Sequence, residues 1–315
     1  MSDTARQGRL GRPAGLPRAV LLVAHARRQE ARTLAREVTD ALSVAGVEVR
    51  VSADEIDDLA SEGRPASGDW VAVAPDEHAA DGTELVVVLG GDGTILRGAE
   101  RARSADVPLL GINLGHVGFL AEAEREGLAD VVDAIVGRTW HVEERTALDV
   151  TVLVDGAVVE RTWALNEVSL EKAARERMID VLVEVDGRPL SRWGCDGVVC
   201  ATPTGSTAYA FSAGGPVVWP EVAALLVVPI SAHALFARPL VVSPDSVVAL
   251  ELPELGSSAV LWADGRRSFD VGPATRIEVR RHAQPVRFAR LASSPFTDRL
   301  VAKFSLPVDG WRGRR

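Results

Sequence analysis

The stretch "ELVVVLGGDGTIL", residues 84–96, decides the fold of the first half of this chain. Five consecutive apolar residues end in a cluster of glycines around Asp92, and a helical pattern starts near Thr94. A strand without polar residues at alternate positions is typical of a parallel sheet that is covered on both faces. The point between such a strand and a helix is where open α/β sheets bind ligands. The stretch therefore predicts a ligand-binding loop in an α/β domain.

Strand and helix patterns alternate on both sides of this loop. Such alternation indicates βαβ units and a parallel sheet, here over residues 1–140. Residues 54–83 are polar with scattered Gly and Pro and are expected to form an irregular loop. The expected strands are residues 19–26, 47–52, 84–89 and 107–113, and the expected helices are residues 28–44 and about 94–103.

The second half, residues 141–294, has a different pattern. Asp155-Gly156 and Asp186-Gly187 each lie between two alternating segments, which is the strongest short signal of a β-hairpin. Further strand-like segments cover residues 246–252, 259–263 and 275–290. We therefore expect a mainly antiparallel β domain. The tail, residues 295–315, has a helical pattern and is expected to pack back on the first domain.

Composition excludes several classes of protein. The chain has 315 residues, a formal net charge of −9 and 25% charged residues. This acidic balance argues against a protein whose main partner is nucleic acid or an anionic membrane. The longest apolar run, residues 222–237, is interrupted by Pro229 and is too short to span a bilayer. We therefore expect two globular domains with no nucleic-acid partner and no membrane partner.

Cysteine use and the N-terminus both favour a cytoplasmic protein. Cys195 and Cys200 match no common metal-binding pattern, so small, buried, free thiols are expected. The apolar segment that follows the arginine-containing first 18 residues is too short for a secretion signal. A loose tail followed by a first strand is the better interpretation.

The dipeptide Asp-Gly occurs seven times, so most copies are expected to be simple turns. The copy at Asp92 differs because glycines at a helix start let backbone N–H groups approach phosphate oxygens. A carboxylate in such a loop repels phosphate unless it acts on a metal or a hydroxyl. Two interpretations remain for Asp92, a catalytic residue and a bare turn, and we favour the first.

A second loop, residues 195–216, crowds hydroxyl side chains around Gly205. Hydroxyls and backbone amides together suit a polar ligand such as a nucleotide, although a hydroxyl-rich turn has the same composition. Tyr209 suits stacking on a base or simple packing. The pair Asn166-Glu167 ends a strand-like segment, where an amide and a carboxylate are able to hydrogen-bond a ribose or a base edge.

Four motifs in this order resemble the signatures of the ATP- or polyphosphate-dependent NAD kinases of actinobacterial type. They are "GGDGT" at 90–94, "GINLGHVGFL" at 111–120, "NEVSL" at 166–170 and "DGVVCATPTGSTAYAFSAGGP" at 196–216. The first motif also occurs in diacylglycerol, sphingosine and phosphofructo-kinases. Its combination with the third motif and with "TPTGSTAY" is highly specific. The resemblance covers most of residues 84–240, and both ends of the chain are also similar to actinobacterial members.

The resemblance implies a Rossmann-like α/β N-terminal domain followed by a mainly antiparallel β C-terminal domain, in a homodimer or homotetramer. It implies that Asp92 is the general base. Family members carry a basic residue two positions before Asp196, where this chain has Gly194, so Arg192 or a neighbouring subunit is the alternative phosphate contact. The implied donor-phosphate loop is Gly90, Gly91, Gly93 and Thr94, and the implied NAD-binding residues are Asp92, Gly93, Arg97, Asn166, Glu167, Arg177, Asp196, Thr207, Ala208, Tyr209, Ala210, Phe211 and Ser212.

The implied reaction is phosphoryl transfer from ATP or inorganic polyphosphate to the 2′-hydroxyl of the adenosine ribose of NAD⁺, giving NADP⁺. Mg²⁺ or another divalent cation is expected to bridge the donor phosphates, although no metal-ligating residues are identifiable. One alternative is a lipid kinase with the same glycine loop, which "TPTGSTAY" and the acidic charge argue against. The other is a non-catalytic NAD(P) sensor, which the intact Asp92 argues against.

Overall fold

The structure is a computed structural model that describes residues 18–61, 63–65, 69–114, 118–124, 127–175, 177–291 and 295–308. The expected N-terminal tail, residues 115–117 of the second motif and the last residues from 309 lie outside these ranges. By their contacts the described residues form two units. The first unit comprises residues up to 116, 120–141 and 289–292, and the second comprises residues 117–119, 142–288 and 293–315.

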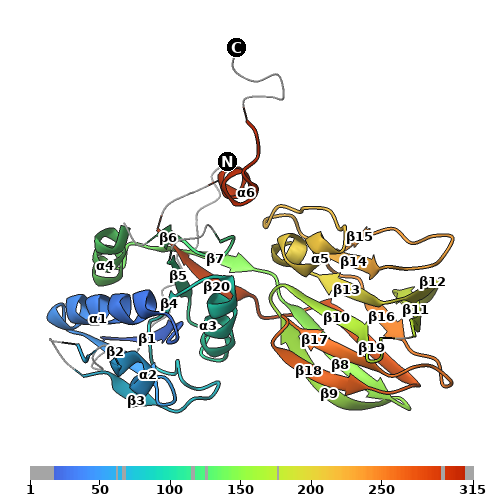
Figure 1. The fold of residues 1–315 in the computed structure, drawn as a ribbon, viewed down its shortest axis with the longest axis horizontal. Coiled ribbons are helices and arrows are strands. Elements are labelled where there is room, and N and C mark those ends of the chain that lie inside the picture. Colours follow the sequence, from blue (N-terminus) through green and yellow to red (C-terminus); the bar gives the residue numbers. More distant parts are fainter. Residues whose placement is uncertain are drawn as a thin grey trace, which may run out of the picture. The chain divides into compact units, whose positions relative to one another are not determined.

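The strands of the first unit belong to an eight-stranded sheet with the order β3-β2-β1-β4-β5-β20-β7, in which β6 pairs with β5, and the first unit holds only His141 of β7 and only Ala289 and Arg290 of β20 (Figure 1). Strands β1 to β6 pair in parallel. The expected parallel sheet is therefore confirmed. The strands are β1 (Arg18–Ala24), β2 (Val47–Ser52), β3 (Val71–Val73), β4 (Leu85–Leu89), β5 (Leu109–Asn113), β6 (Ala123–Glu124), β7 (His141–Arg145) and β20 (Val286–Arg290), and the helices are α1 (Gln29–Val44), α2 (Ile56–Ala60), α3 (Asp92–Ser104) and α4 (Leu128–Gly137).

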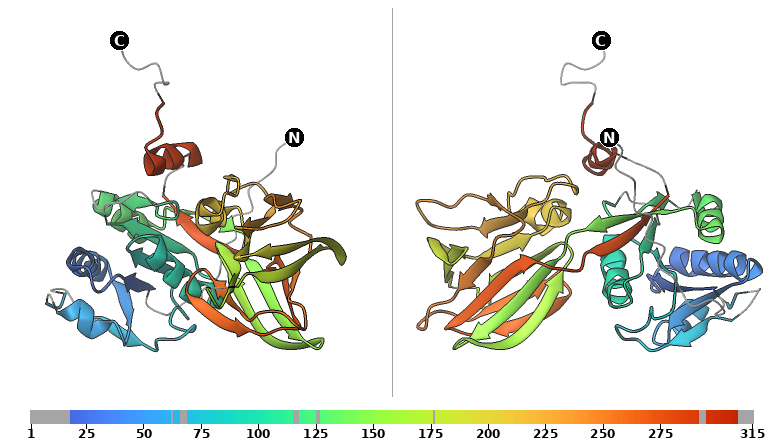
Figure 2. Two further views of the ribbon diagram at one scale, coloured as in Figure 1. Left: turned by 45° about the vertical axis from the view of Figure 1, so that its right-hand side comes forward. Right: turned by 180° about the vertical axis from the view of Figure 1, so that it is seen from behind.

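Strand β4 is fully buried because helices cover both of its faces. Val87 packs in one core with Leu34 of α1 and Val131 of α4. Val88 faces the other way, against Gly98 of α3, where an added Cβ would lie 2.4 Å from Val88 Cγ2. Figures 1 and 2 show α1 and α4 on one side of these strands and α3 on the other. This arrangement explains the uninterrupted apolar run.

The second unit packs two six-stranded sheets around a common core that includes Trp193 and Leu261. Their orders are β15-β14-β13-β10-β17-β18 and β12-β11-β16-β19-β8-β9, and all pairs are antiparallel. The strands are β8 (Leu148–Val154), β9 (Ala157–Ala164), β10 (Glu167–Lys172), β11 (Ile179–Val185), β12 (Arg188–Cys195), β13 (Gly197–Ala201), β14 (Leu225–Ile230), β15 (Leu240–Val242), β16 (Val248–Glu251), β17 (Ala259–Ala263), β18 (Arg267–Val271) and β19 (Thr275–Arg281), and the helices are η2 (Thr204–Thr207, 3₁₀), α5 (Tyr209–Ser212) and α6 (Phe296–Phe304).

Both predicted hairpins are confirmed, together with the predicted fold class. Asp155 and Asp186 have φ of 50° and 54°, and the glycines that follow them also have positive φ, as the favoured two-residue hairpin turn requires. The expected irregular loop is wrong in two places, because α2 and β3 lie within residues 54–83. Both elements are too short for a sequence period to reveal them. Residues 293–315 group with the second unit by their contacts, so the predicted domain limits remain a prediction.

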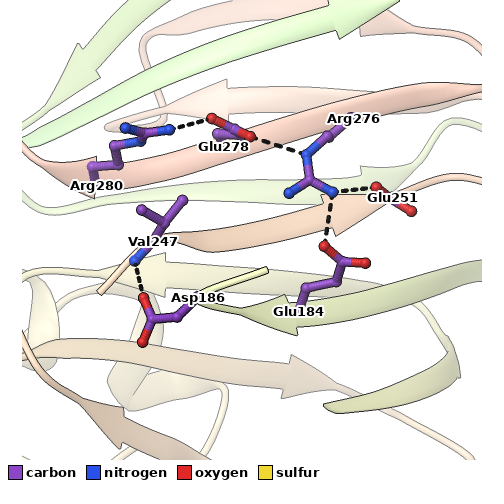
Figure 3. Close-up of polar contacts among 7 residues, drawn as sticks. All are labelled: Glu184, Asp186, Val247, Glu251, Arg276, Glu278 and Arg280. Atoms are coloured by element: carbon purple, nitrogen blue, oxygen red, sulfur yellow. Dashed lines mark hydrogen bonds and ion pairs between the residues drawn. The ribbon is translucent and has the colours of Figure 1, made fainter. Parts of the chain in front are cut away.

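An ion network ties three strands of the second unit together. The Arg276 guanidinium donates to Glu184 at 2.8 Å, to Glu278 at 3.0 Å and to Glu251 (Figure 3). Burial alone lowers the pKa of Arg276, but these three carboxylates raise it well above its usual value. Burial likewise tends to raise the pKa of Glu278, which hydrogen bonds from Arg276 and Arg280 bring below its usual value. One cation thus pairs with three carboxylates, from β11, β16 and β19.

Replacing Arg276 by Gln is expected to destabilise the protein by about 1–3 kcal/mol, because three partly buried carboxylates then lose the cation that they share. The matched control is Arg280→Gln, which removes a half-exposed partner of Glu278 alone and should cost less than about 1 kcal/mol. Urea unfolding of both variants measures the difference. Equal losses would show that the network contributes no more than an ordinary surface pair.

Candidate active site

The glycine loop lies at the carboxyl end of β4 and leads into α3. Gly91 is the residue before the helix, and the N–H groups of Thr94 and Ile95 both donate to its carbonyl, at 2.8 and 3.1 Å. Among the described residues, no atom lies within 4 Å of a Cβ added to Gly91 or Gly93. Packing of the described chain therefore does not demand glycine at these two positions. Open backbone at a helix start suits the approach of phosphate oxygens.

Asp92 is the first residue of α3 and is partly exposed. Its Oδ1 accepts the N–H of Leu120 at 3.3 Å. Leu120 belongs to the "GINLGHVGFL" motif, so two motifs that are distant in sequence meet at this carboxylate. Glu122, two residues on, receives Arg290 Nη1 at 3.0 Å, and both side chains are almost fully buried. The segment that contacts Asp92 is thereby fixed to β20.

Arg97 lies one turn further along α3, where its side chain meets residues of the same unit. Its Nη2 donates to the carbonyl of Ala24 at 2.6 Å, and its Nη1 lies 3.5 Å from Oε1 of Glu55. Arg101 also approaches this buried carboxylate, at 3.1 Å. The side chain of Arg97 thus has an internal structural role, and its contact with NAD remains a prediction.

In the second unit, Asn166 and Glu167 lie at the start of β10 and are both nearly buried. The carboxylate of Asp264 accepts the N–H groups of Leu165 at 2.9 Å, Asn166 at 2.7 Å and Glu167 at 3.3 Å. Gly205 lies so close that an added Cβ would be 2.0 Å from the Asn166 carbonyl oxygen. The hydroxyl-rich loop and the Asn-Glu pair are therefore one local structure.

The carboxyl group of Glu167 is electrostatically unusual. Burial and the neighbouring charge of Asp264 raise the pKa of Glu167 to about 8, against a weaker opposing effect of the Tyr209 N–H. That N–H donates to Glu167 Oε2 at 3.4 Å. Glu167 is therefore largely protonated at neutral pH and able to donate a hydrogen bond from its carboxyl group.

The predicted segment Thr207 to Ser212 begins at the end of η2 and forms α5. Ala210 is buried, whereas Tyr209 and Phe211 are 36% and 41% exposed. Tyr209 thus presents an accessible ring beside Glu167, as a base-stacking residue requires. Burial, and then the charges of Glu171, Glu167 and Asp196, raise the pKa of its phenol.

Helix α6 contacts this segment through an aromatic ring. Phe304 lies 4.7 Å from Phe211 and 5.9 Å from Phe119 between ring centroids, and Phe296 lies 5.2 Å from Trp219. Arg299 Nη1 also donates to the carbonyl of Phe119 at 3.1 Å. No residue of α6 is buried.

The remaining predicted residues lie apart from this cluster or pair with other side chains. Arg177 is exposed ahead of β11. Asp196, between β12 and β13, lies 2.6 Å from Lys172 Nζ. Arg192, the alternative phosphate contact, lies 3.3 Å from Asp180 on the neighbouring strand. Their roles toward a ligand remain predictions.

The structure bears on the thiols, on metal-binding clusters and on membrane-spanning helices. Cys195 and Cys200 are free and buried, as expected, and burial raises the pKa of each to about 12, which keeps both thiols unreactive. No group of three or more His, Cys, Asp or Glu side chains that could hold a metal is found in the described part of the chain. No helix within the described ranges is long and apolar enough to cross a membrane.

Sequence reasoning missed Asp264 and Thr202 as organisers of the site. Asp264 was counted only as one of seven turn-forming Asp-Gly pairs, and its φ of 53° shows that it is also a turn residue. Thr202 was one hydroxyl among many. Its pairing with the carbonyl of Leu165, 37 positions away, has no local sequence signal.

Known proteins match along the whole chain. A family model described as "ATP-NAD kinase N-terminal domain" matches residues 20–139, and one described as "ATP-NAD kinase C-terminal domain" matches residues 165–291. The "NAD kinase" of Thermobifida fusca is 57% identical over 320 residues, covering 100% of this chain and 98% of its own length. The "NAD kinase" of Mycobacterium tuberculosis is 54% identical over 303 residues, covering 94% of this chain and 99% of its own.

Two solved structures are also similar. The crystal structure of yeast NADH kinase complexed with NADH has a TM-score of 0.82 and 25% identity, and it covers 95% of this chain and 90% of its own. The crystal structure of an NAD kinase from Archaeoglobus fulgidus in complex with ATP has a TM-score of 0.69 and 27% identity, and the match covers 92% of this chain and 100% of that chain.

Glu167→Gln is expected to raise the melting temperature more at high pH than at low pH. The carboxyl pKa is about 8 in the folded protein against a usual 4.5, so the native state holds a proton that the unfolded chain loses. Stability therefore falls as pH rises through this window, and the uncharged amide removes that dependence. Thermal unfolding from about pH 5 to about pH 9 measures it. The exposed Glu254→Gln is the control, and a Glu167→Gln advantage that is constant with pH would contradict the prediction.

Proposed function

This chain belongs to the NAD kinase family, and we propose that it transfers the terminal phosphoryl group of ATP to the 2′-hydroxyl of the adenosine ribose of NAD⁺. The observation that carries this proposal is the match to NAD kinases along the full chain, with Asp92 at a helix start whose glycine backbone is open.

We assign the general-base role to Asp92. As the ribose 2′-oxygen attacks the γ-phosphorus, its proton passes to the Asp92 carboxylate and the bond from the γ-phosphorus to the β,γ-bridging oxygen breaks, releasing ADP. The hydrogen bond from the Leu120 N–H holds one carboxylate oxygen in a fixed direction. The open backbone at Gly91 and Gly93 and the start of α3 would receive donor phosphate oxygens.

Asn166, Glu167 and the Thr207–Ser212 segment would bind NAD. The accessible ring of Tyr209 would stack on a base, and the Asn166 and Glu167 side chains would hydrogen-bond the nucleoside. Asp196 would assist with its carboxylate, as the family resemblance implies. These groups would bind and orient the acceptor NAD⁺, whereas Asp92 would accept the proton of its 2′-hydroxyl.

Mg²⁺ is proposed as a companion of the phosphoryl donor rather than as a resident ion. Since no cluster of metal-ligating side chains is found among the described residues, its ligands would be donor phosphate oxygens and water, as Mg²⁺ commonly prefers. When bound, the ion offsets the charge of the phosphates. Inorganic polyphosphate is a second proposed donor, because only a terminal phosphoanhydride needs to enter the glycine loop.

We also propose a cytoplasmic homodimer or homotetramer. The free thiols of Cys195 and Cys200 suit a reducing compartment. Leu235 and Phe236, in the loop after β14, are exposed apolar side chains of the kind that subunit contacts cover. Sedimentation under assay conditions should therefore give a mass above the 33.5 kDa of one chain, and a monomer at that mass overturns the proposed assembly.

Asp92→Asn is expected to lower kcat for NADP⁺ formation about 10²- to 10⁴-fold, because the amide keeps the shape of the side chain and removes the proton acceptor. The dissociation constant for NAD⁺ should change much less. Both quantities are measured with ATP and then with polyphosphate as donor, with and without Mg²⁺.

Asp81→Asn is the matched control, since Asp81 is an exposed residue of another Asp-Gly turn. It should leave kcat unchanged. Near-wild-type kcat in Asp92→Asn would remove Asp92 from the mechanism. A wild-type protein that binds NAD⁺ without turnover would favour the non-catalytic sensor.

A further inference from the structure

The turn formed by residues 165–167 leaves no backbone polar group without a partner. Its three N–H groups donate to the Asp264 carboxylate, at 2.7–3.3 Å. The carbonyl of Leu165 accepts the Thr202 hydroxyl at 2.6 Å, and the carbonyl of Asn166 accepts the Thr202 N–H at 2.9 Å. The carbonyl of Glu167 accepts the Asp264 N–H at 2.9 Å. Two buried residues therefore hold every peptide group of the turn.

The polar contacts of Asp264 favour its charged form. Three backbone N–H groups and the Arg267 guanidinium, whose Nη2 lies 3.4 Å from Oδ2, all point donors at its two oxygens. A proton on this carboxyl would face donors only. Burial raises the pKa of Asp264 above its usual value, and these donors offset only part of the rise. The donors thus stabilise a negative charge directly behind Asn166 and Glu167.

This buried charge acts on Glu167. Of the described groups around Glu167, Asp264 from the β17–β18 turn is the charged one that acts directly on it, and Tyr209 from α5 supplies a backbone N–H. Arg267 lies behind Asp264, and Glu171 and Asp196 act on the Tyr209 phenol. A second negative charge on Glu167 would thus meet repulsion from Asp264, whose cation Arg267 is already paired with it.

We propose that Asp264 is a positioning residue of the NAD site, which with Thr202 fixes the direction of the Asn166 and Glu167 side chains and whose carboxylate repels a negative charge on Glu167. A protonated Glu167 donates a hydrogen bond to an acceptor atom of the nucleoside and adds no charge to a site that receives pyrophosphate. Asp264 itself touches only peptide groups and Arg267, so it acts through the pair it supports. The inference rests on the proposed role of Asn166 and Glu167 in binding NAD.

Asp264→Asn is the direct test. One amide oxygen still accepts an N–H, but the amide nitrogen faces a donor, and the charge behind Glu167 is gone. We expect KM for NAD⁺ to rise about ten- to a hundredfold, with a smaller change in kcat. We also expect kcat/KM for NAD⁺ to fall as Glu167 ionises, near pH 8 in the wild type and at lower pH in Asp264→Asn.

Asp270→Asn is the matched control, because Asp270 is an exposed carboxylate of the adjoining strand β18. It should leave both KM and the pH profile at their wild-type values. A merely structural role of Asp264 would reduce the folded fraction, and hence the apparent kcat, without moving the pH profile. In a folded Asp264→Asn protein, either an unchanged KM for NAD⁺ or an unmoved pH profile overturns the proposal.

Thr202→Val keeps the proposal testable if Asp264→Asn does not fold. It removes the hydroxyl that binds the Leu165 carbonyl and leaves the charge, so KM for NAD⁺ should rise while the pH profile stays in place. Thr202→Ser restores the hydroxyl and should recover most of the loss. A Thr202→Val protein with wild-type KM overturns the positioning role. Direct titration of NAD⁺ binding separates this inference from the activity, since a wild-type protein that does not phosphorylate NAD⁺ contradicts the proposed function instead.

Discussion

Buried N–H and C=O groups that have no partner in a β-sheet must form hydrogen bonds elsewhere in the protein. This requirement determines the local structure around Asn166 in the second unit. Unpaired N–H and C=O groups there would each cost free energy comparable to a lost hydrogen bond. The chain meets the requirement with one carboxylate from the β17–β18 turn and one threonine after β13. Gly205 then lies so close to the Asn166 carbonyl that no side chain fits at position 205. The position of the hydroxyl-rich loop follows from the same contacts.

Two acidic side chains of this chain are placed in contrasting environments. Asp92 is partly exposed at the first turn of a helix, where the helix dipole favours negative charge. Glu167 is buried beside another carboxylate, which disfavours its negative charge. The first environment suits a proton acceptor and the second a hydrogen-bond donor. Environment rather than residue type separates the two proposed roles, as in other enzymes with paired carboxylic acids.

Local sequence patterns correctly predicted the strands and turns that neighbouring residues alone determine. The apolar run of β4 and the Asp-Gly hairpins at Asp155 and Asp186 depend on neighbouring residues, and the structure has them as expected. Helix α2 and strand β3 were missed because each is stabilised by contacts with distant residues rather than by a sequence period. Asp264 was missed for the same reason. Its Asp-Gly turn is locally ordinary, and only the folded chain brings it to Asn166, 98 positions away.

Helix α6 illustrates how unequal the stability of different regions can be within one chain. It buries no side chain and is held by ring contacts with Phe119, Phe211 and Trp219 and by one hydrogen bond from Arg299. Local opening of a segment costs free energy in proportion to what it buries. The amide protons of α6 will therefore exchange with solvent far sooner than those of β13 or β4. Each such opening also removes the contact between Phe304 and the ring of Phe211 in α5.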